Sequence, residues 1–173
     1  MYLLTDLIKK CNSSLKLPSK SYLLALLATV KQVLSSEENS IRPKTPFEES
    51  GALICLDTSL PTLLVPDIHG RTDFFINIMN YLITPEKTVL NLLEEQKIQV
   101  VCLGDGFHGE KRVKDRWLAA FTKWQEGIIQ SPEMIEEMTE SLCVMELVMN
   151  AKIQFPQHFH FLKGNHENIL NEE

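Results

Sequence analysis

The chain has 173 residues, of which 44% are hydrophobic and 23% are charged. These shares are close to the average of globular proteins and exclude a disordered or fibrous chain. The formal charge of −6 does not attract a phosphate backbone or an anionic lipid surface. Neither a nucleic-acid scaffold nor a membrane is therefore an expected partner.

The cysteines and the first residues bear on the compartment. The four cysteines are scattered without a C-x-x-C pair, which favours reduced and mostly buried thiols. The first ten residues place Asp6 among apolar residues and the lysines after them, the reverse of a secretory signal. The most apolar run, 22–30, is far shorter than the ~20 residues that span a bilayer. We expect a cytoplasmic protein.

Two helices are predicted before residue 50. Apolar residues recur at helical spacing over 20–36, after a Pro-Ser start signal, and a shorter helix is expected at 2–10. The polar stretch 35–50 contains two prolines and has no periodicity, which predicts a loop. Residues 1–50 are thus expected to form a helical appendage and linker, and residues 51–173 to form the main domain.

The main domain alternates short apolar runs with helical patterns. Strands are predicted at 51–57, 62–66, 97–104 and 158–164, and helices at 71–83, 85–96, 111–127 and 132–152. Strands that alternate with helices are typical of an α/β fold with a largely parallel sheet.

Polar loops follow three of the predicted strands, and each loop carries side chains that can bind a metal ion. The chain reads Pro-Asp-Ile-His-Gly at 66–70, Gly-Asp-Gly-Phe-His-Gly at 104–109 and Gly-Asn-His-Glu at 164–167. Ligands of open α/β sheets bind just outside the carboxyl ends of the strands. Any one of these loops is ordinary for a surface turn, but three in order, each directly after an apolar strand, predict a metal centre.

The donor types indicate the chemistry of this centre. Carboxylate, imidazole and amide oxygen without thiolate suit Mn, Fe or Zn, and the choice among them stays open. We expect two divalent ions held by Asp67, His69, Asp105 and Asn165, with Asp105 as the bridge. Such a pair of ions supplies hydroxide near neutral pH, and His166 is placed to protonate the leaving oxygen as general acid.

The three loops resemble the first three motifs of calcineurin-like metallophosphoesterases, which read G-D-x-H-G, G-D-x-x-D-R-G and G-N-H-E. The similarity covers about residues 62–168 and is greatest to the branch that contains serine/threonine protein phosphatases and diadenosine tetraphosphatases. It implies a metal-dependent hydrolase of phosphate esters, with the ligands and the general acid named above. It also implies the first half of a four-layered α/β/β/α sandwich, in which two sheets meet at the metal site.

The chain departs from the family pattern in its first two motifs. The first opens with Pro in place of Gly, and Gly109 stands where the second motif has its phosphate-binding Arg. Arg71, Lys111 or Arg112 could take the place of that Arg. For the basic run at 111–116, however, the favoured interpretation is a solvated helix face without a phosphate-binding role. His108 is equally well explained as a phosphate donor or spare ligand and as a plain loop residue.

A further departure follows the third motif. The family completes its metal site with two more histidines downstream, whereas this chain ends at Glu173. His160 lies ~17 Å before Asn165 on a straight strand, so His158 and His160 are expected to be remote from the ions. The first ion keeps three protein ligands and the second only two. We therefore expect a domain that is truncated at its C-terminus.

Two interpretations of function follow. The first is an active phosphoesterase, whose substrate could be protein phosphoserine, a dinucleotide polyphosphate or a small phosphomonoester. The second is a truncated, catalytically impaired fragment that acts by binding, or that needs a second chain with the missing C-terminal half. Half a sandwich also leaves one face of its sheet bare, which predicts self-association unless the helices at 2–36 cover that face.

Overall fold

A three-stranded parallel sheet organises the structure, a computed structural model that describes residues 2–49 and 51–167. Its strands, in the spatial order β1-β4-β5, are β1 (Thr62–Val65), β4 (Gln99–Cys102) and β5 (Phe159–Phe161). Cys102 at the end of β4 pairs with Val65 on one side and Phe161 on the other. The three strands therefore end level with one another, and the polar loops leave the sheet at one edge. The predicted α/β class with a parallel sheet is confirmed.

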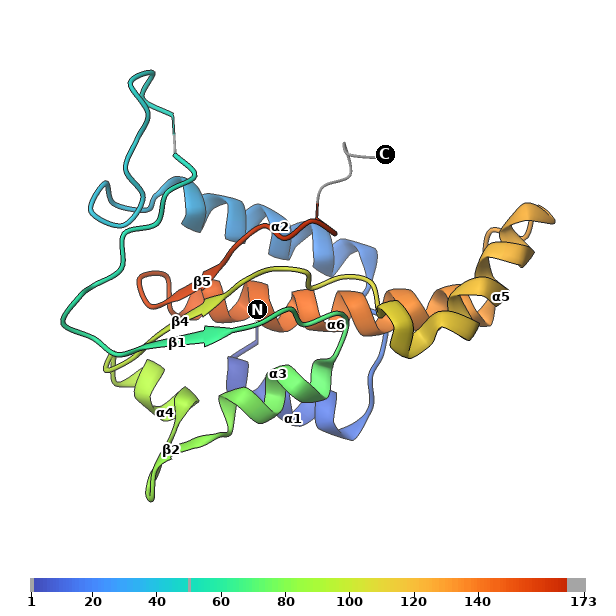
Figure 1. The fold of residues 1–173 in the computed structure, drawn as a ribbon, viewed down its shortest axis with the longest axis horizontal. Coiled ribbons are helices and arrows are strands. Elements are labelled where there is room, and N and C mark those ends of the chain that lie inside the picture. The colour runs from blue at the N-terminus through green and yellow to red at the C-terminus, as the bar shows by residue number, and fades with distance from the viewer. Residues whose placement is uncertain (1, 50, 168–173) are drawn as a thin grey trace.

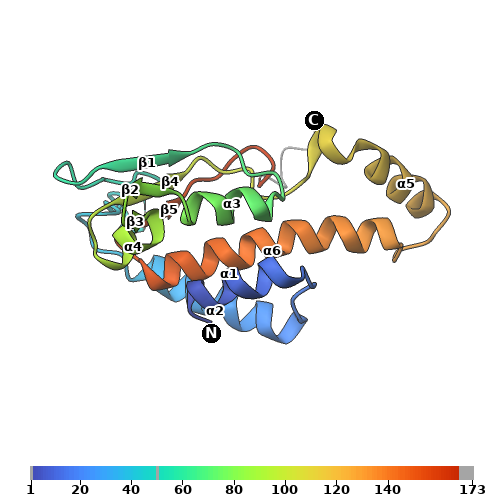
Figure 2. The same cartoon turned by 90° about the horizontal axis from the view of Figure 1, so that it is seen from below.

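The helices form two layers on one side of the sheet (Figure 2). The layer next to the sheet holds α3 (Thr72–Met79), α4 (Val89–Glu94) and α6 (Pro132–Gln154). The outer layer holds α1 (Leu4–Ser13) and α2 (Lys20–Ser35). The first turn of α6 begins as the sequence predicts, because the Ser131 side chain accepts a hydrogen bond from the Met134 N–H and Pro132 needs no donor.

One helix stands apart from these layers. A short 3-10 turn (Glu110–Val113) leads into α5 (Lys114–Gln125), which confirms the helical pattern at 111–127. Helix α5 and the first part of α6 form an arm that projects from the sheet beyond its carboxyl edge (Figure 1). The arm thus begins at the polar loop that follows β4.

Three predicted elements differ in the structure. The helix expected at 71–83 ends at Met79, and residues 82–83 belong to a strand instead. Residues 51–57 form no strand, because the segment is held by a side chain: Gln99 Nε2 donates to Asp57 O at 2.7 Å, and the Asp57 N–H donates to Gln99 Oε1 at 3.2 Å. The helix expected from residue 85 begins only at Val89. Thr88 and Asn91 form a capping box there, and the hairpin of β2 (Leu82–Thr84) and β3 (Lys87–Thr88) occupies the preceding residues.

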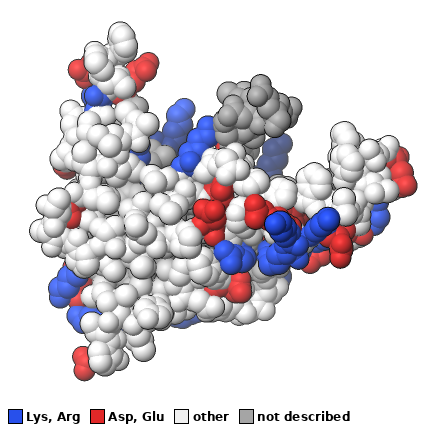
Figure 3. All heavy atoms as spheres, in the orientation of Figure 1, with Lys and Arg blue, Asp and Glu red and all other residues white. Residues whose placement is uncertain are grey.

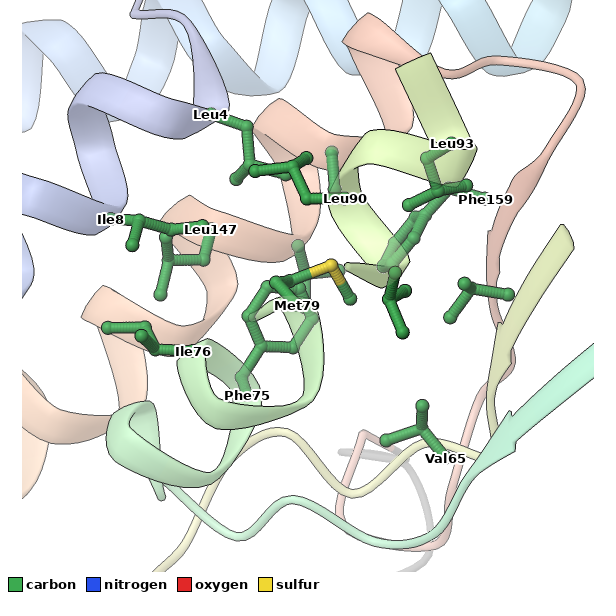
Figure 4. Close-up of a cluster of buried hydrophobic side chains, with 14 of the residues drawn as sticks. Leu4, Ile8, Val65, Phe75, Ile76, Met79, Leu90, Leu93, Leu147 and Phe159 are labelled. Atoms are coloured by element: carbon green, nitrogen blue, oxygen red, sulfur yellow. The ribbon is translucent and has the colours of Figure 1, made fainter. Parts of the chain in front are cut away.

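One buried cluster joins the sheet to four helices (Figure 4). Val65 and Phe159 from the sheet face Phe75 and Met79 from α3, and Leu147 of α6 lies in the same cluster. Helix α1 adds a stripe of apolar side chains at helical spacing, namely Leu4, Leu7 and Ile8. Burial of each large apolar side chain contributes about 1.5–3 kcal/mol, so this cluster fixes the sheet on which the loops stand.

The opposite face of the sheet is only partly covered, since Val101 and His160 are buried on it and Leu64 beside them is not. Leu64 is 60% exposed and Leu103 is 43% exposed, and the surface above the strands carries few charges (Figure 3). Helices α1 and α2 lie against α6 on the far side (Figure 2), so the alternative that they cover this face is wrong. Helix α1 buries its apolar stripe, whereas in α2 only Leu26 is buried. Self-association through the opposite face of the sheet stays a prediction.

The cysteine thiols are mostly buried, as expected from the sequence. Cys11, Cys102 and Cys143 are buried, Cys55 is exposed, and all four are free thiols. Within residues 2–49 and 51–167, every helix is too short or too polar to cross a bilayer.

Candidate metal centre

The first loop places two candidate ligands side by side. Asp67 and His69 lie two residues apart, and His69 Nε2 is 3.9 Å from Asp67 Oδ2. The loop is fastened to the second loop by its backbone, since the His69 N–H donates to Asp105 O at 2.6 Å and the Gly70 N–H donates to Gly106 O at 2.9 Å. The candidate ligands of two different strands are therefore held together by main-chain hydrogen bonds.

Asp105 completes a three-residue cluster with this pair. One ligand atom from each of Asp67, His69 and Asp105 lies within 4.8 Å of the other two. Asp105 is only 5% exposed, whereas the Asp67 side chain is 55% exposed, so the cluster is closed on one side and open to solvent on the other. Two carboxylates and an imidazole fit a divalent ion such as Mn, Fe or Zn.

The ring of His69 is held in the orientation that ligation needs. Its Nδ1 lies 3.0 Å from the carbonyl oxygen of His108. A carbonyl can only accept, so Nδ1 carries the proton and the lone pair of Nε2 faces Asp67. Metal-binding histidines in proteins use the same arrangement to fix their tautomer.

Strained backbone is concentrated at this site. His69, Asp105, His108 and Glu110 have φ values of 48°, 49°, 66° and 49°, in the left-handed region that favours glycine. Each such residue costs roughly 1–2 kcal/mol. Non-glycine residues persist in this region where surrounding contacts determine the conformation, and such residues cluster at functional sites.

Glu167 fastens the third loop to the second, a role that the sequence analysis missed. Its carboxylate accepts hydrogen bonds from three backbone N–H groups, those of Asp105 (2.8 Å), Gly106 (2.7 Å) and Gly164 (2.8 Å). The signal was present in the sequence, because this residue is the last of the Gly-Asn-His-Glu loop. Glu167 therefore holds the second and third loops together through their backbone N–H groups.

Two glycines permit the loops to approach so closely. A Cβ on Gly164 would overlap Asp105 Oδ1, and a Cβ on Gly104, whose φ is 113°, would lie 2.7 Å from the Gly164 Cα. No larger residue fits either position without moving the loops. The Asp105 carboxylate therefore lies directly against the backbone of the third loop.

The third loop also brings His166 to the cluster. The His166 N–H donates to Asp105 Oδ1 at 2.9 Å, and the His166 ring lies edge-on to that of His69 with centroids 5.3 Å apart. Asn165, the remaining candidate ligand, is exposed on the same loop. The structure thus gathers the side chains of Asp67, His69 and Asp105, and places His166 beside them.

Glu110 is a second residue that the sequence analysis missed. Its Oε2 lies 3.6 Å from His69 Nε2, and its Oε1 lies 3.4 Å from His166 Nε2. Ligand atoms of these three residues form another group within 4.8 Å. Glu110 thereby offers a further carboxylate beside His69, a ligand predicted for the first ion. Only its position just after the second motif could have indicated this.

The arginines considered for phosphate binding have protein partners. Arg71 donates to the carbonyl oxygens of Ile68 (3.1 Å) and Asp67 (2.9 Å). Arg112 pairs with Glu140 at 2.7 Å. Burial by itself raises the pKa of Glu140, but hydrogen bonds from Arg116 and Arg112 outweigh it and lower that pKa below its usual value. A phosphate role for Arg71 or Arg112 stays a prediction.

The other predicted residues lie as follows. His108 accepts a hydrogen bond at Nδ1 from the Glu110 N–H and stacks on Trp117 with centroids 5.5 Å apart. His160 is buried on β5, where it contacts Lys152 and Gln157. Charged side chains of both signs gather around the loops and the start of α5 (Figure 3).

Comparison with known proteins adds nothing to this geometry, because no protein-family model and no curated protein matches the chain.

Proposed function

We propose that the chain is a metal-dependent hydrolase of phosphate esters, and that its sheet corresponds to the first sheet of a metallophosphoesterase sandwich. The observation that carries the proposal is the convergence of Asp67, His69 and Asp105 within 4.8 Å at the carboxyl edge of parallel strands. The strained loops around this cluster and the fixed His69 tautomer support it.

The candidate residues have two roles, metal binding and proton transfer. Asp67, His69 and Asp105 would hold one divalent ion, with Glu110 as a further carboxylate beside His69, and Asp105 and Asn165 would hold a second. Two divalent ions bound there would polarise a phosphate ester and activate water for attack. His166 protonates the leaving oxygen as general acid, and Glu110 Oε1 lies 3.4 Å from its Nε2.

Hydrolysis of an aryl and an alkyl phosphate with Mn²⁺ tests the proposal. Asp67→Asn and Asp105→Asn should abolish the metal-dependent rate, whereas Asp115→Asn, an exposed carboxylate on α5, is the matched control. His166→Ala should lower kcat by about 10²–10⁴ for the alkyl ester and by less for the aryl ester, whose leaving group needs no proton. Equal rates in all variants would refute the assignment.

Metal binding without turnover is the second candidate function. It is favoured by the open side of the cluster, where the Asp67 side chain is 55% exposed and faces solvent. A calorimetric titration with Mn²⁺ separates the two. Two ions per chain together with turnover support the hydrolase, and one weakly bound ion without turnover supports the alternative.

A further inference from the structure

A cavity of about 490 Å³ lies between α5 and α6 and reaches the metal-binding loops. Its volume is within the range of pockets that bind small molecules, about 300–1,000 Å³. The side chains that matter for the argument are Trp117, Phe121, Trp124, Met134, Met138 and His166. The cavity is thus walled by aromatic rings and thioethers and has a histidine of the candidate site at one end.

The aromatic wall is an ordered stack of rings. Trp117 and Phe121 lie 5.9 Å apart with planes at 16°, and Phe121 and Trp124 lie 5.8 Å apart at 24°. His108 continues the stack, 5.5 Å from Trp117. The spacing of four and three residues puts the three large rings on one face of α5.

These rings are left open to solvent. Trp117 is 41% exposed, Phe121 is 40% exposed and Trp124 is 57% exposed. Rings of this size stabilise proteins chiefly when they are buried, and they stack favourably on other planar groups. A row of open, nearly parallel rings is therefore suited to a flat, apolar ligand. Met134 and Met138 on α6 suit it too, because thioethers contact ring edges favourably.

Two polar side chains of the cavity, Glu137 and Ser141, already have partners within the protein. Glu137 Oε1 accepts from the Gly109 N–H at 2.9 Å, and its Oε2 pairs with Arg116 at 2.6 Å. Ser141 Oγ accepts from the His108 N–H at 3.3 Å. The cavity lining, as far as the structure describes it, includes no lysine or arginine. The cavity therefore does not favour the binding of an anionic group, whereas it does favour the binding of an uncharged ring.

The cavity and the candidate metal centre share residues. His166 lines the cavity, and the centroid of its ring lies 5.3 Å from that of His69 and 5.2 Å from that of His108. In the proposed mechanism His166 protonates the leaving oxygen. A group attached to that oxygen would then lie on the side of His166 that lines the aromatic cavity.

We infer that the cavity binds an uncharged aromatic ring carried by the alcohol portion of the phosphate ester. This inference depends on the proposed function, and among the open substrate classes it favours small phosphomonoesters with an aromatic alcohol. Trp117 and Phe121 hold the ring by stacking. The metal centre at the end of the cavity holds the phosphate.

The kinetic test compares phenethyl phosphate with ethyl phosphate, whose leaving groups are both primary alcohols. Wild type should show the higher kcat/KM for the phenethyl ester. Trp117→Ala should lower kcat/KM for phenethyl phosphate about tenfold more than for ethyl phosphate, whereas Trp117→Phe should keep the wild-type preference. Tyr81→Ala, an aromatic residue 65% exposed outside the arm, is the control. Equal kcat/KM for both esters in wild type would overturn the inference.

The binding test needs no catalysis and so separates the two proposals. Both tryptophans of the chain line the cavity, so intrinsic fluorescence reports directly on it. Phenethyl alcohol, added without metal, should shift the emission saturably to shorter wavelength, and Trp117→Ala should weaken the apparent affinity about tenfold, read from Trp124. Saturable binding without hydrolysis of either ester refutes the hydrolase but supports an aromatic site.

Two results overturn the cavity assignment whatever the activity. The first is the lack of a saturable response to phenethyl alcohol. The second is an emission shift that depends on protein concentration and coincides with dimer formation in size-exclusion chromatography, which would show that a second copy covers the rings.

Discussion

His160 should make the fold sensitive to mild acid. The side chain is 2% exposed on β5, and its two ring nitrogens have different partners. Nε2 lies 3.2 Å from the carbonyl oxygen of Gln157, and Nδ1 lies 3.4 Å from the ammonium of Lys152. The carbonyl only accepts and the ammonium only donates. The site therefore accommodates the neutral ring with its proton on Nε2, and a second proton on Nδ1 would face a positive charge.

The size of the loss in folding stability follows from the pKa of His160. Burial, and after it the charge of Lys152, lowers the pKa of His160 from 6.5 to about 4. Because the folded chain binds the proton less readily than the unfolded chain, the stabilisation is complete above pH 6.5 and is lost as the pH falls to about 4. At about 1.4 kcal/mol per pKa unit, the loss amounts to roughly 3 kcal/mol.

Urea unfolding at a series of pH values measures this loss in wild type and in His160→Gln. The glutamine amide does not titrate, yet it can donate to Gln157 O and accept from Lys152. Between pH 6.5 and 4 the free energy of unfolding of wild type should fall by roughly 3 kcal/mol more than that of the variant. Subtracting the variant's curve from that of wild type cancels the titration of groups that both proteins share, including Glu37. If the two curves run parallel, the histidine is not buried as a neutral ring and the reasoning is wrong.

Two further substitutions probe how the loops are held. Glu167→Gln leaves one acceptor oxygen for three N–H groups and turns an NH₂ toward one of them. It should lower the free energy of unfolding by about 2 kcal/mol, seen as a fall of roughly 4–8 °C in the thermal midpoint, whereas the exposed Glu94→Gln should stay within about 0.5 kcal/mol. Gly164→Ala puts a methyl group against Asp105 and should weaken Mn²⁺ binding by about 10–100-fold. Unchanged binding in a calorimetric titration would show that Asp105 is positioned by other contacts.

The sequence correctly predicted the helices and strands that depend only on a local pattern of apolar and polar residues. Apolar runs that end at polar loops identified β1, β4 and β5, and helical periodicity identified α1, α2, α3, α5 and α6. The first residues of α4 were misplaced because Thr88 and Asn91 cap the helix more effectively than Pro85 starts it. The false strand at 51–57 had the composition of a strand, but a Gln99 side chain took up the backbone groups of Asp57 that a neighbouring strand would have paired.

By itself the sequence determined which residue types stand at the strand ends, because alternation of apolar and polar segments is a local property. It could not show that Glu110 turns back between His69 and His166, or that Glu167 accepts from three N–H groups of two loops. These contacts depend on the level alignment of three parallel strands, which brings together residues far apart in the chain. The aromatic cavity likewise exists only because α5 folds back along α6, since a helical repeat of rings says nothing of what faces it.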